Sequence, residues 1–525
     1  MAKKSNGHLR KGAATKPAAR RRPDRTPRKR GHAEGTTSDV RNGTATQPVG
    51  GHPDRAPIAA TAAPREDQDR KSSDADKEHP ISRAVDSFLA AMQDYRDGAF
   101  VAIPLVLEKR QDELKQQFSA MSKFPSKKLP EGGMEFTPDG PHAASQLLAT
   151  IRTIDMLSKS KIHEVMARSM FIGMFSEFDA FSGALLKALY SKRGELYRAI
   201  KREISLGDIL NAGTVDELMQ DILDREIDSF RRQSYPDQFA ELERRFDIES
   251  LRKFDEWPVF VELGQRRNLL THNDGQVSHQ YLSVCEREGF QFNEKPAVKQ
   301  RLTVDPEYLA KAMLILSKVA FMLAHTLWRK VLPDERESAD NAFNDTLFTL
   351  LLRREWRQAA EFGEFGMSPQ LCRKSNDLLR RIRIVNTAIA LTNMKRTKEA
   401  IRILDGEDWS AAIREFRLAN AVLRGEYKTA AQLMKEIGKR GEHLTQMSYH
   451  DWPLFNDFRD SEHFQSAYED IYGLPFLQKL SEDAMVRSAQ IKKDLARQGL
   501  PAQQPQKQTA RATRGAKNRA HDLES

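Results

Sequence analysis

Cysteine is almost absent from the sequence, and so are apolar runs long enough to cross a membrane. The 525 residues include only Cys285 and Cys372, which excludes a disulfide framework and fits a reducing cytoplasm. Neither cysteine has a Cys or His neighbour at metal-ligand spacing, so we expect both to be ordinary small apolar residues. No apolar core of a secretion signal follows the first charged residues. These absences predict a cytoplasmic protein that does not contact a membrane.

Several motifs that bind nucleotides or metals are also missing. The sequence has no Walker phosphate loop, no Rossmann glycine fingerprint, no His-Glu-x-x-His helix and no Asp-rich metal loop. We therefore expect no cofactor and no bound metal. Strand-like alternation is nearly absent as well, so the predicted fold class is all-α. The length leaves room for two or three domains.

The net charge of +10 is concentrated at the two ends of the chain. Residues 1–80 hold 18 Lys and Arg against 10 Asp and Glu, and residues 498–525 hold 5 against 2, so residues 81–497 are close to neutral. Both ends have few large apolar residues, which predicts disordered tails. The runs Arg20–Arg22 and Arg28–Arg30 are either solvated or attract RNA phosphates, and the second also fits a nuclear localisation signal.

Apolar residues at helical spacing predict one helical domain over residues 81–332. We expect helices within 81–123, two long helices across 143–200, and helix starts at Ser205, Thr214, Pro236 and Asp305-Pro306. The stretch from 276 to 304 looks irregular. Lys311, Lys318 and His325 interrupt the last apolar stripe, so this helix is predicted to be a core helix rather than a membrane span.

The segment Arg266–Gly275 stands out, because its histidine and second arginine suit RNA cleavage. Histidine as a residue type can exchange a proton near neutral pH, so a histidine at position 272 can take a proton from a 2′-hydroxyl or give one to a leaving oxygen. Arg267 offers a planar cation that fits phosphate, and Asn268 can orient either residue. Five residues of helix separate the two by about 140° and roughly 7.5 Å along the axis. Either the helix end distorts, or two copies of the chain pool their residues.

Two acidic residues, Glu177 and Asp179, lie within a helix that is rich in phenylalanine. An acid among apolar side chains is costly to bury unless it is paired. Two positions on a helix differ by about 200°, so only one of the pair can point at a given site. We expect Asp179 to hold Arg267 or His272 in place. The alternative is a partly exposed helix face.

The segment resembles the HEPN domain, whose ribonuclease members carry Arg, a polar residue, three more residues and then His. Further similarity to one branch, the RiboL-PSP-like one, extends over about residues 140–330. It lies in Ile204–Leu210, Arg225–Phe230, Phe246–Ile248, Trp257-Pro258, Val277 and Tyr281-Leu282. Some HEPN nucleases also carry a Glu-x-Asp pair near this motif, as Glu177 and Asp179 do here.

The resemblance implies a homodimer with its site at the interface, in a prokaryotic toxin–antitoxin or anti-phage defence system that cleaves transfer, ribosomal or messenger RNA. An inactive HEPN domain is the alternative, with Arg267 in a salt bridge and His272 as a helix cap.

Residues 331–342 are predicted to be a short hydrophilic linker, and residues 343–480 a small helical solenoid. Gly425–Ala431 resembles the turn of a tetratricopeptide repeat, with an approximate repeat length of 34 residues. Such paired helices usually bind a protein or peptide, and the HEPN resemblance implies an antitoxin as that partner. The alternative is a scaffold that covers one side of the first domain.

Two classes of function fit these patterns. The first is a metal-independent endoribonuclease that leaves a 2′,3′-cyclic phosphate and a 5′-hydroxyl. The second is a non-catalytic adapter that dimerises and recruits a protein partner. The adapter predicts that Arg267 and His272 are buried and paired within one chain, whereas the enzyme predicts both open to solvent at an interface.

Overall fold

The computed structural model describes residues 78–372 and 374–497, without the side chains of residues 482, 483 and 494–496. The predicted tails lie outside the described residues, except for positions 78–80. The all-α class is confirmed: helices dominate, and the described part of the chain has two short strands. These strands, β1 (Ser126–Lys128) and β2 (Met134–Phe136), form an antiparallel hairpin in which Lys127 lies opposite Glu135.

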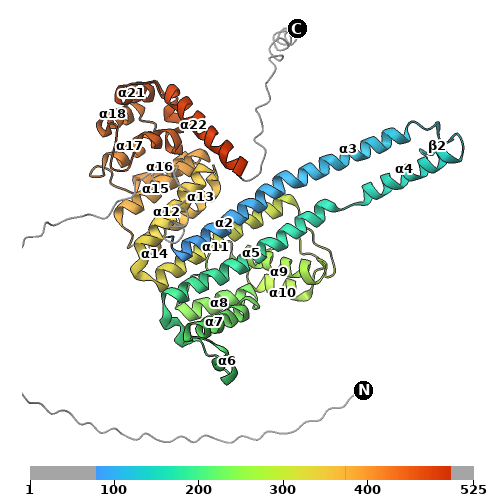
Figure 1. The fold of residues 1–525 in the computed structure, drawn as a ribbon, viewed down its shortest axis with the longest axis horizontal. Coiled ribbons are helices and arrows are strands. Elements are labelled where there is room, and N and C mark those ends of the chain that lie inside the picture. The colour runs from blue at the N-terminus through green and yellow to red at the C-terminus, as the bar shows by residue number, and fades with distance from the viewer. Residues whose placement is uncertain (1–77, 373, 498–525) are drawn as a thin grey trace, which may run out of the picture. The chain divides into compact units, whose positions relative to one another are not determined.

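Long helices build the first part of the described chain (Figure 1). In order they are α2 (Pro80–Asp97), a π-helical segment (Gly98–Ala102), α3 (Ile103–Met121), α4 (Pro141–Lys159) and α5 (Ile162–Lys192), which a short 3₁₀ helix (Gly194–Ala199) follows. Helices α2 and α5 pack against each other, and α11 packs against both. Phenylalanines of α5 fill this core, since Phe171, Phe175 and Phe178 are fully buried.

Shorter helices follow, and most start where their caps predict. They are α6 (Leu206–Asn211), α7 (Val215–Arg231), α8 (Tyr235–Phe246), α9 (Trp257–His272), α10 (His279–Arg287) and α11 (Pro306–Val331). Ser205 forms a capping box with Asp208, Thr214 caps α7, and Asp305 caps α11.

The prediction that residues 276–304 are irregular is wrong in part, because they contain α10. Its nine residues are too few to show a clear helical period in the sequence. Ser278 caps the helix. Tyr281 and Cys285 are buried together with Leu269 in a small hydrophobic cluster that is separate from the main core. Cys285 is fully buried as expected, and burial raises the pKa of its thiol to about 12.

Helix α11 is long and apolar enough to cross a membrane, but about 67% of its most apolar stretch is buried inside the protein. It packs against α2, α5, α12 and α13. Burial of this kind is that of a core helix, as the interrupted apolar stripe predicted. A location in the cytoplasm stays a prediction.

Pairs of shorter helices make up the rest of the described chain. They are α12 (Arg336–Leu352), α13 (Trp356–Gly366), α14 (Pro369–Cys372), α15 (Asp377–Asn393), α16 (Thr397–Asp405), α17 (Arg414–Leu423), α18 (Tyr427–Ile437), α19 (Gln446–Asp451), α20 (Asn456–Arg459), α21 (Glu462–Tyr472) and α22 (Phe476–Arg497), with short 3₁₀ helices at Pro333–Glu335 and Pro453–Phe455.

Neighbours in this series pack together: α13 on α15, α15 on α16, α17 on α18, and α18 on α21. Gly425 makes the predicted turn between α17 and α18 with a φ of 75°. The predicted domain end at residue 480 falls inside α22. Resemblance to tetratricopeptide repeats stays a prediction.

The predicted linker 331–342 is wrong, because α12 begins at Arg336 and the segment is part of the core. Asp340 is only 1% exposed, and its Oδ1 accepts hydrogen bonds from Arg329 at 2.6 Å and from Arg383 at 2.8 Å. Burial alone would raise the pKa of Asp340, but the two arginines hold it below the usual value. One buried carboxylate therefore joins α11, α12 and α15.

His325, beside this cluster, predicts a pH dependence of stability. Burial, with Arg329 and Arg383 nearby, lowers the pKa of His325 well below its ordinary 6.5. In the unfolded chain His325 binds a proton below about pH 6.5, whereas in the folded chain it stays neutral. The free energy of unfolding therefore decreases as the pH falls below that point. Relative to His325→Gln, the wild type should lose up to ~1.4 kcal/mol per pH unit below that point. Urea unfolding at pH 7, 6 and 5 measures this, and parallel curves for the two proteins would contradict it.

Candidate active site

Helix α9 carries all three residues of the predicted catalytic motif. Its C-terminal end is fixed by two backbone bonds, in which the N–H groups of Asn273 and Gly275 donate to the Leu269 carbonyl at 2.8 and 3.0 Å. Gly275 has a φ of 76°, and a Cβ there would lie 2.7 Å from the carbonyl oxygen of Leu302. Only glycine fits this turn. The motif residues are Arg267, Asn268 and His272.

Arg267 is held by an acidic partner from α5. Its Nη2 donates to Oδ2 of Asp179 at 2.8 Å, and its Nη1 donates to Oδ1 of Asn268 at 3.1 Å. The guanidinium carbon lies 6.0 Å from the centre of the Phe175 ring. Its other N–H groups make no hydrogen bond to any described residue. Because the Arg267 side chain is 24% exposed, these donors remain open to a ligand.

The contact between Asp179 and Arg267 is one of the two that the sequence analysis expected for this acid. Burial raises the pKa of Asp179, while Tyr235, Arg267 and Arg231 act in the opposite direction. The Tyr235 hydroxyl donates to Oδ1 of Asp179 at 2.9 Å. Gly264 of α9 makes room for this ring, because a Cβ there would lie 2.6 Å from Tyr235 Cδ2. Tyr235 was not foreseen, since no local pattern links it to a residue 56 positions earlier.

Glu177 lies on a different side of α5, as the helical geometry requires. Burial and the Glu177 carboxylate raise the pKa of Tyr95 on α2. A Cβ on Gly173, one turn before Glu177, would overlap the Tyr95 hydroxyl. Glu177 thus faces α2, whereas Asp179 faces α9. The structure does not bring Glu177 to the Arg267 site.

His272 does not meet Arg267 within one chain. The helix continues regularly through both residues, which keeps their side chains on different sides of α9. His272 is exposed, and among the described residues it makes no hydrogen bond or ion pair. One chain therefore presents a partly exposed, oriented arginine and an exposed histidine, but not as a single site.

Two arginines surround the turn that follows His272. Arg168 of α5 donates to Asp274 at 2.8 Å and to the Leu270 carbonyl, and Arg301 donates to Asp274 Oδ1 at 3.1 Å. These cations lower the pKa of Asp274, with the Arg168 hydrogen bond as the largest cause. Two cations share one carboxylate, so the surface beside His272 carries positive charge that favours phosphate.

No protein-family model, curated protein or solved structure matches this chain. The HEPN resemblance therefore rests on the sequence motifs alone.

Arg266, the first residue of the segment, is structural. It pairs with Glu262 at 2.8 Å and stacks 4.1 Å from the centre of the Tyr308 ring. The hydroxyls of Tyr281 and Tyr308 donate to the two oxygens of Glu262 at 2.6 and 2.7 Å. Glu262 is 1% exposed, so this network fixes α9 against α10 and α11.

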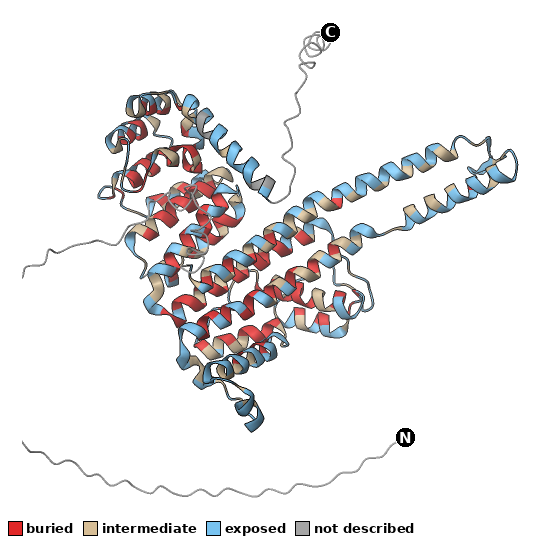
Figure 2. Ribbon diagram, viewed as in Figure 1, coloured by how far each residue is buried: buried red, intermediate tan, exposed pale blue. Residues whose placement is uncertain are grey.

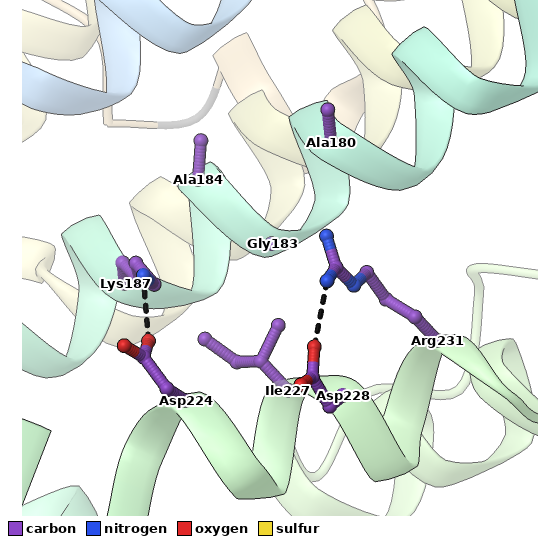
Figure 3. Close-up of a pocket in the computed structure, with 8 residues that line it drawn as sticks. All are labelled: Ala180, Gly183, Ala184, Lys187, Asp224, Ile227, Asp228 and Arg231. Carbon is purple, nitrogen blue, oxygen red and sulfur yellow. Dashed lines mark hydrogen bonds and ion pairs between the residues drawn. The ribbon is translucent and has the colours of Figure 1, made fainter. Parts of the chain in front are cut away.

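A shallow pocket of about 410 Å³ lies between α5 and α7 (Figure 3). Small residues form its wall on α5, and ion pairs flank it: Lys187 with Asp224 at 2.5 Å and Arg231 with Asp228 at 2.7 Å. Because Arg231 is neutralised by an acid of its own helix, we assign this pocket no part in the site.

Proposed function

We propose that this protein is a metal-independent endoribonuclease whose site is shared between two copies of the chain. The observation that carries the proposal is the placement of Arg267. Asp179 and Asn268 orient its guanidinium, yet part of it stays open to solvent. A cation fixed in this way is suited to a phosphate group, because no reorganisation is needed when the charge develops.

His272 supplies the proton transfer in this proposal. The 2′-oxygen of the RNA attacks the adjacent phosphorus, the bond from phosphorus to the 5′-oxygen breaks, and a 2′,3′-cyclic phosphate and a 5′-hydroxyl are formed. His272 takes the proton of the 2′-hydroxyl or gives one to the leaving 5′-oxygen. Arg267 stabilises the negative charge on the phosphate. The HEPN resemblance adds a toxin or anti-phage setting and a protein or antitoxin partner for the helical repeats.

Two copies are needed because one helix does not aim both residues at one point. A two-fold axis close to the end of α9 would place Arg267 of one chain near His272 of the other. Asp179, Asn268 and Tyr235 then act as positioning residues for Arg267. The positive surface at Arg168 and Arg301 adds attraction for the RNA backbone.

Cleavage of RNA in the presence of EDTA tests this proposal. Purified protein should cut total cellular RNA as well with EDTA as without it, since no step uses a metal. The fragments should resist 3′-end ligation until the cyclic phosphate is opened and the remaining phosphate is removed to leave a 3′-hydroxyl, and their 5′ ends should accept phosphate from a kinase. Loss of cleavage on adding EDTA, or products with 5′-phosphates, would contradict the mechanism.

A non-catalytic adapter is the second candidate, and one observation favours it. Arg267 is ion-paired within a single chain, as the adapter predicted. The exposure of His272 points the other way, because an adapter has no use for it in that position. A folded, dimeric wild type that cuts no RNA would favour the adapter.

A further inference from the structure

The helices α3 and α4 are exposed along most of their length (Figure 2), and an unusual number of their exposed residues are large and apolar. Each helix has 19 residues, yet only Ile103 of α3 and Leu147 of α4 are buried. Exposed apolar residues continue into the first turns of α5, where Val165 is 60% exposed. The full set is Phe100, Val101, Leu105, Leu107, Phe118, Leu129, Met134, Leu148, Ile151, Met156, Ile162 and Val165, which we call the hairpin surface.

The hairpin surface has the composition of an interface. Monomeric proteins rarely leave connected apolar patches beyond a few hundred Å² in water. The side chains point in several directions, since Leu105 and Leu107 lie about 200° apart on α3, so one partner covers only part of the set. Leu107 and Phe118, eleven positions apart, share one side of α3, and Leu148 and Ile151 are neighbours on α4.

The hairpin surface is not covered by any other part of the described chain. The other described residues leave it exposed, and the remaining segments are poor in large apolar residues. Residues 2–77 contain Leu9, Val40, Val49 and Ile58, and residues 498–525 contain Leu500 and Leu523. Segments of this composition bury little apolar area, so the cover comes from another molecule.

Charge favours a second copy of the chain as that molecule. Residues 103–159 hold eight Lys and Arg against seven Asp and Glu, and the two signs alternate along the helices. A nucleic acid or a strongly charged protein prefers a surface of one sign. Two copies of a mixed, nearly neutral surface do not repel each other. In a dimer with two-fold symmetry each contact is also formed twice.

Arg168 connects the hairpin surface to the candidate active site. It follows Val165 by one turn of α5 and contacts both Asp274 and the Leu270 carbonyl at the end of α9. His272 lies at that same helix end. The hairpin surface therefore extends towards His272, the residue that needs a second chain in the proposed function.

We propose that two copies of this chain pair through α3, α4 and the first turns of α5. The pairing brings the α9 ends of both copies to one interface, where each Arg267 has access to the partner's His272. The role of this dimer in catalysis rests on the proposed function, but its formation is measured without RNA.

The molar mass in solution tests the pairing. Wild type should have the mass of a dimer by light scattering after size exclusion, and the double variant Ile151→Glu, Met156→Glu should have that of a monomer. Both residues are exposed, so the variant should fold, which its thermal unfolding checks. The matched control is Leu210→Glu, Val486→Glu, which charges exposed apolar residues on α6 and α22 and should stay dimeric.

A monomeric wild type, or a double variant that remains dimeric, would overturn the pairing. The outcome for the proposed function is separate. A hairpin variant that stays dimeric and still cuts RNA would contradict the proposed pairing and support the proposed nuclease. If the wild type is a dimer, the hairpin variant is a monomer and neither cuts RNA, the proposed pairing is supported and the proposed nuclease is contradicted.

Discussion

Replacing His272 with alanine should lower RNA cleavage by roughly 10²- to 10⁴-fold, which is the range that a positioned acid or base contributes. The loss should come without loss of stability. His272 is exposed and contacts no described residue by a hydrogen bond or ion pair, so the folded state does not depend on it. Initial cleavage rates with EDTA present, beside melting temperatures of both proteins, measure the two effects.

His279 provides the matched control for this substitution. It is an exposed histidine in the first turn of α10, seven residues further along the chain. The variant His279→Ala should cut RNA at the wild-type rate. Equal cleavage by wild type and His272→Ala would mean that the site lies elsewhere or that a contaminating nuclease is at work.

Replacing Asp340 with asparagine should destabilise the protein by about 3–5 kcal/mol, the cost of breaking a buried ion pair from one side. The two arginines that it neutralises, Arg329 and Arg383, would then be left buried with excess positive charge. Burial already lowers the pKa of Arg329 to about 10, which shows how strongly this environment resists a cation. The midpoint of urea unfolding measures the loss.

Glu337 is the control for this second substitution, since it is exposed and lies in the same helix, three residues earlier. Glu337→Gln should change stability by less than about 0.5 kcal/mol. An Asp340→Asn protein as stable as wild type would show that the cluster does not join α11, α12 and α15 as described.

The sequence predicted the helices and one long-range contact because both depend on simple rules. Helix starts follow from local caps, as at Ser205 and Asp305. An acid among phenylalanines needs a cation, so a basic partner was expected for Asp179, and Arg267 and His272 were both left open. The helical rotation also separated Glu177 from Asp179. Each of these inferences needs at most a few residues at known spacing.

The features that the sequence missed depend on distant partners. Residues 331–342 are polar, so they resembled a linker, and the burial of Asp340 depends on Arg329 and on Arg383, which lies 43 positions later. Tyr235 and Arg168 reach the site from α8 and α5 without any local signal. The exposed apolar side chains of α3 and α4 follow helical spacing, which in the sequence looks the same as a core.

Trans-complementation tests the shared site most directly. Arg267→Ala and His272→Ala are purified separately, then mixed and refolded together with EDTA present, and RNA cleavage is measured before and after mixing. Each variant alone should be inactive. A mixed dimer contains one intact site, so the mixture should regain up to about a quarter of wild-type activity. A mixture that forms mixed dimers, shown by co-purification of two different tags, and yet stays inactive would contradict the shared site.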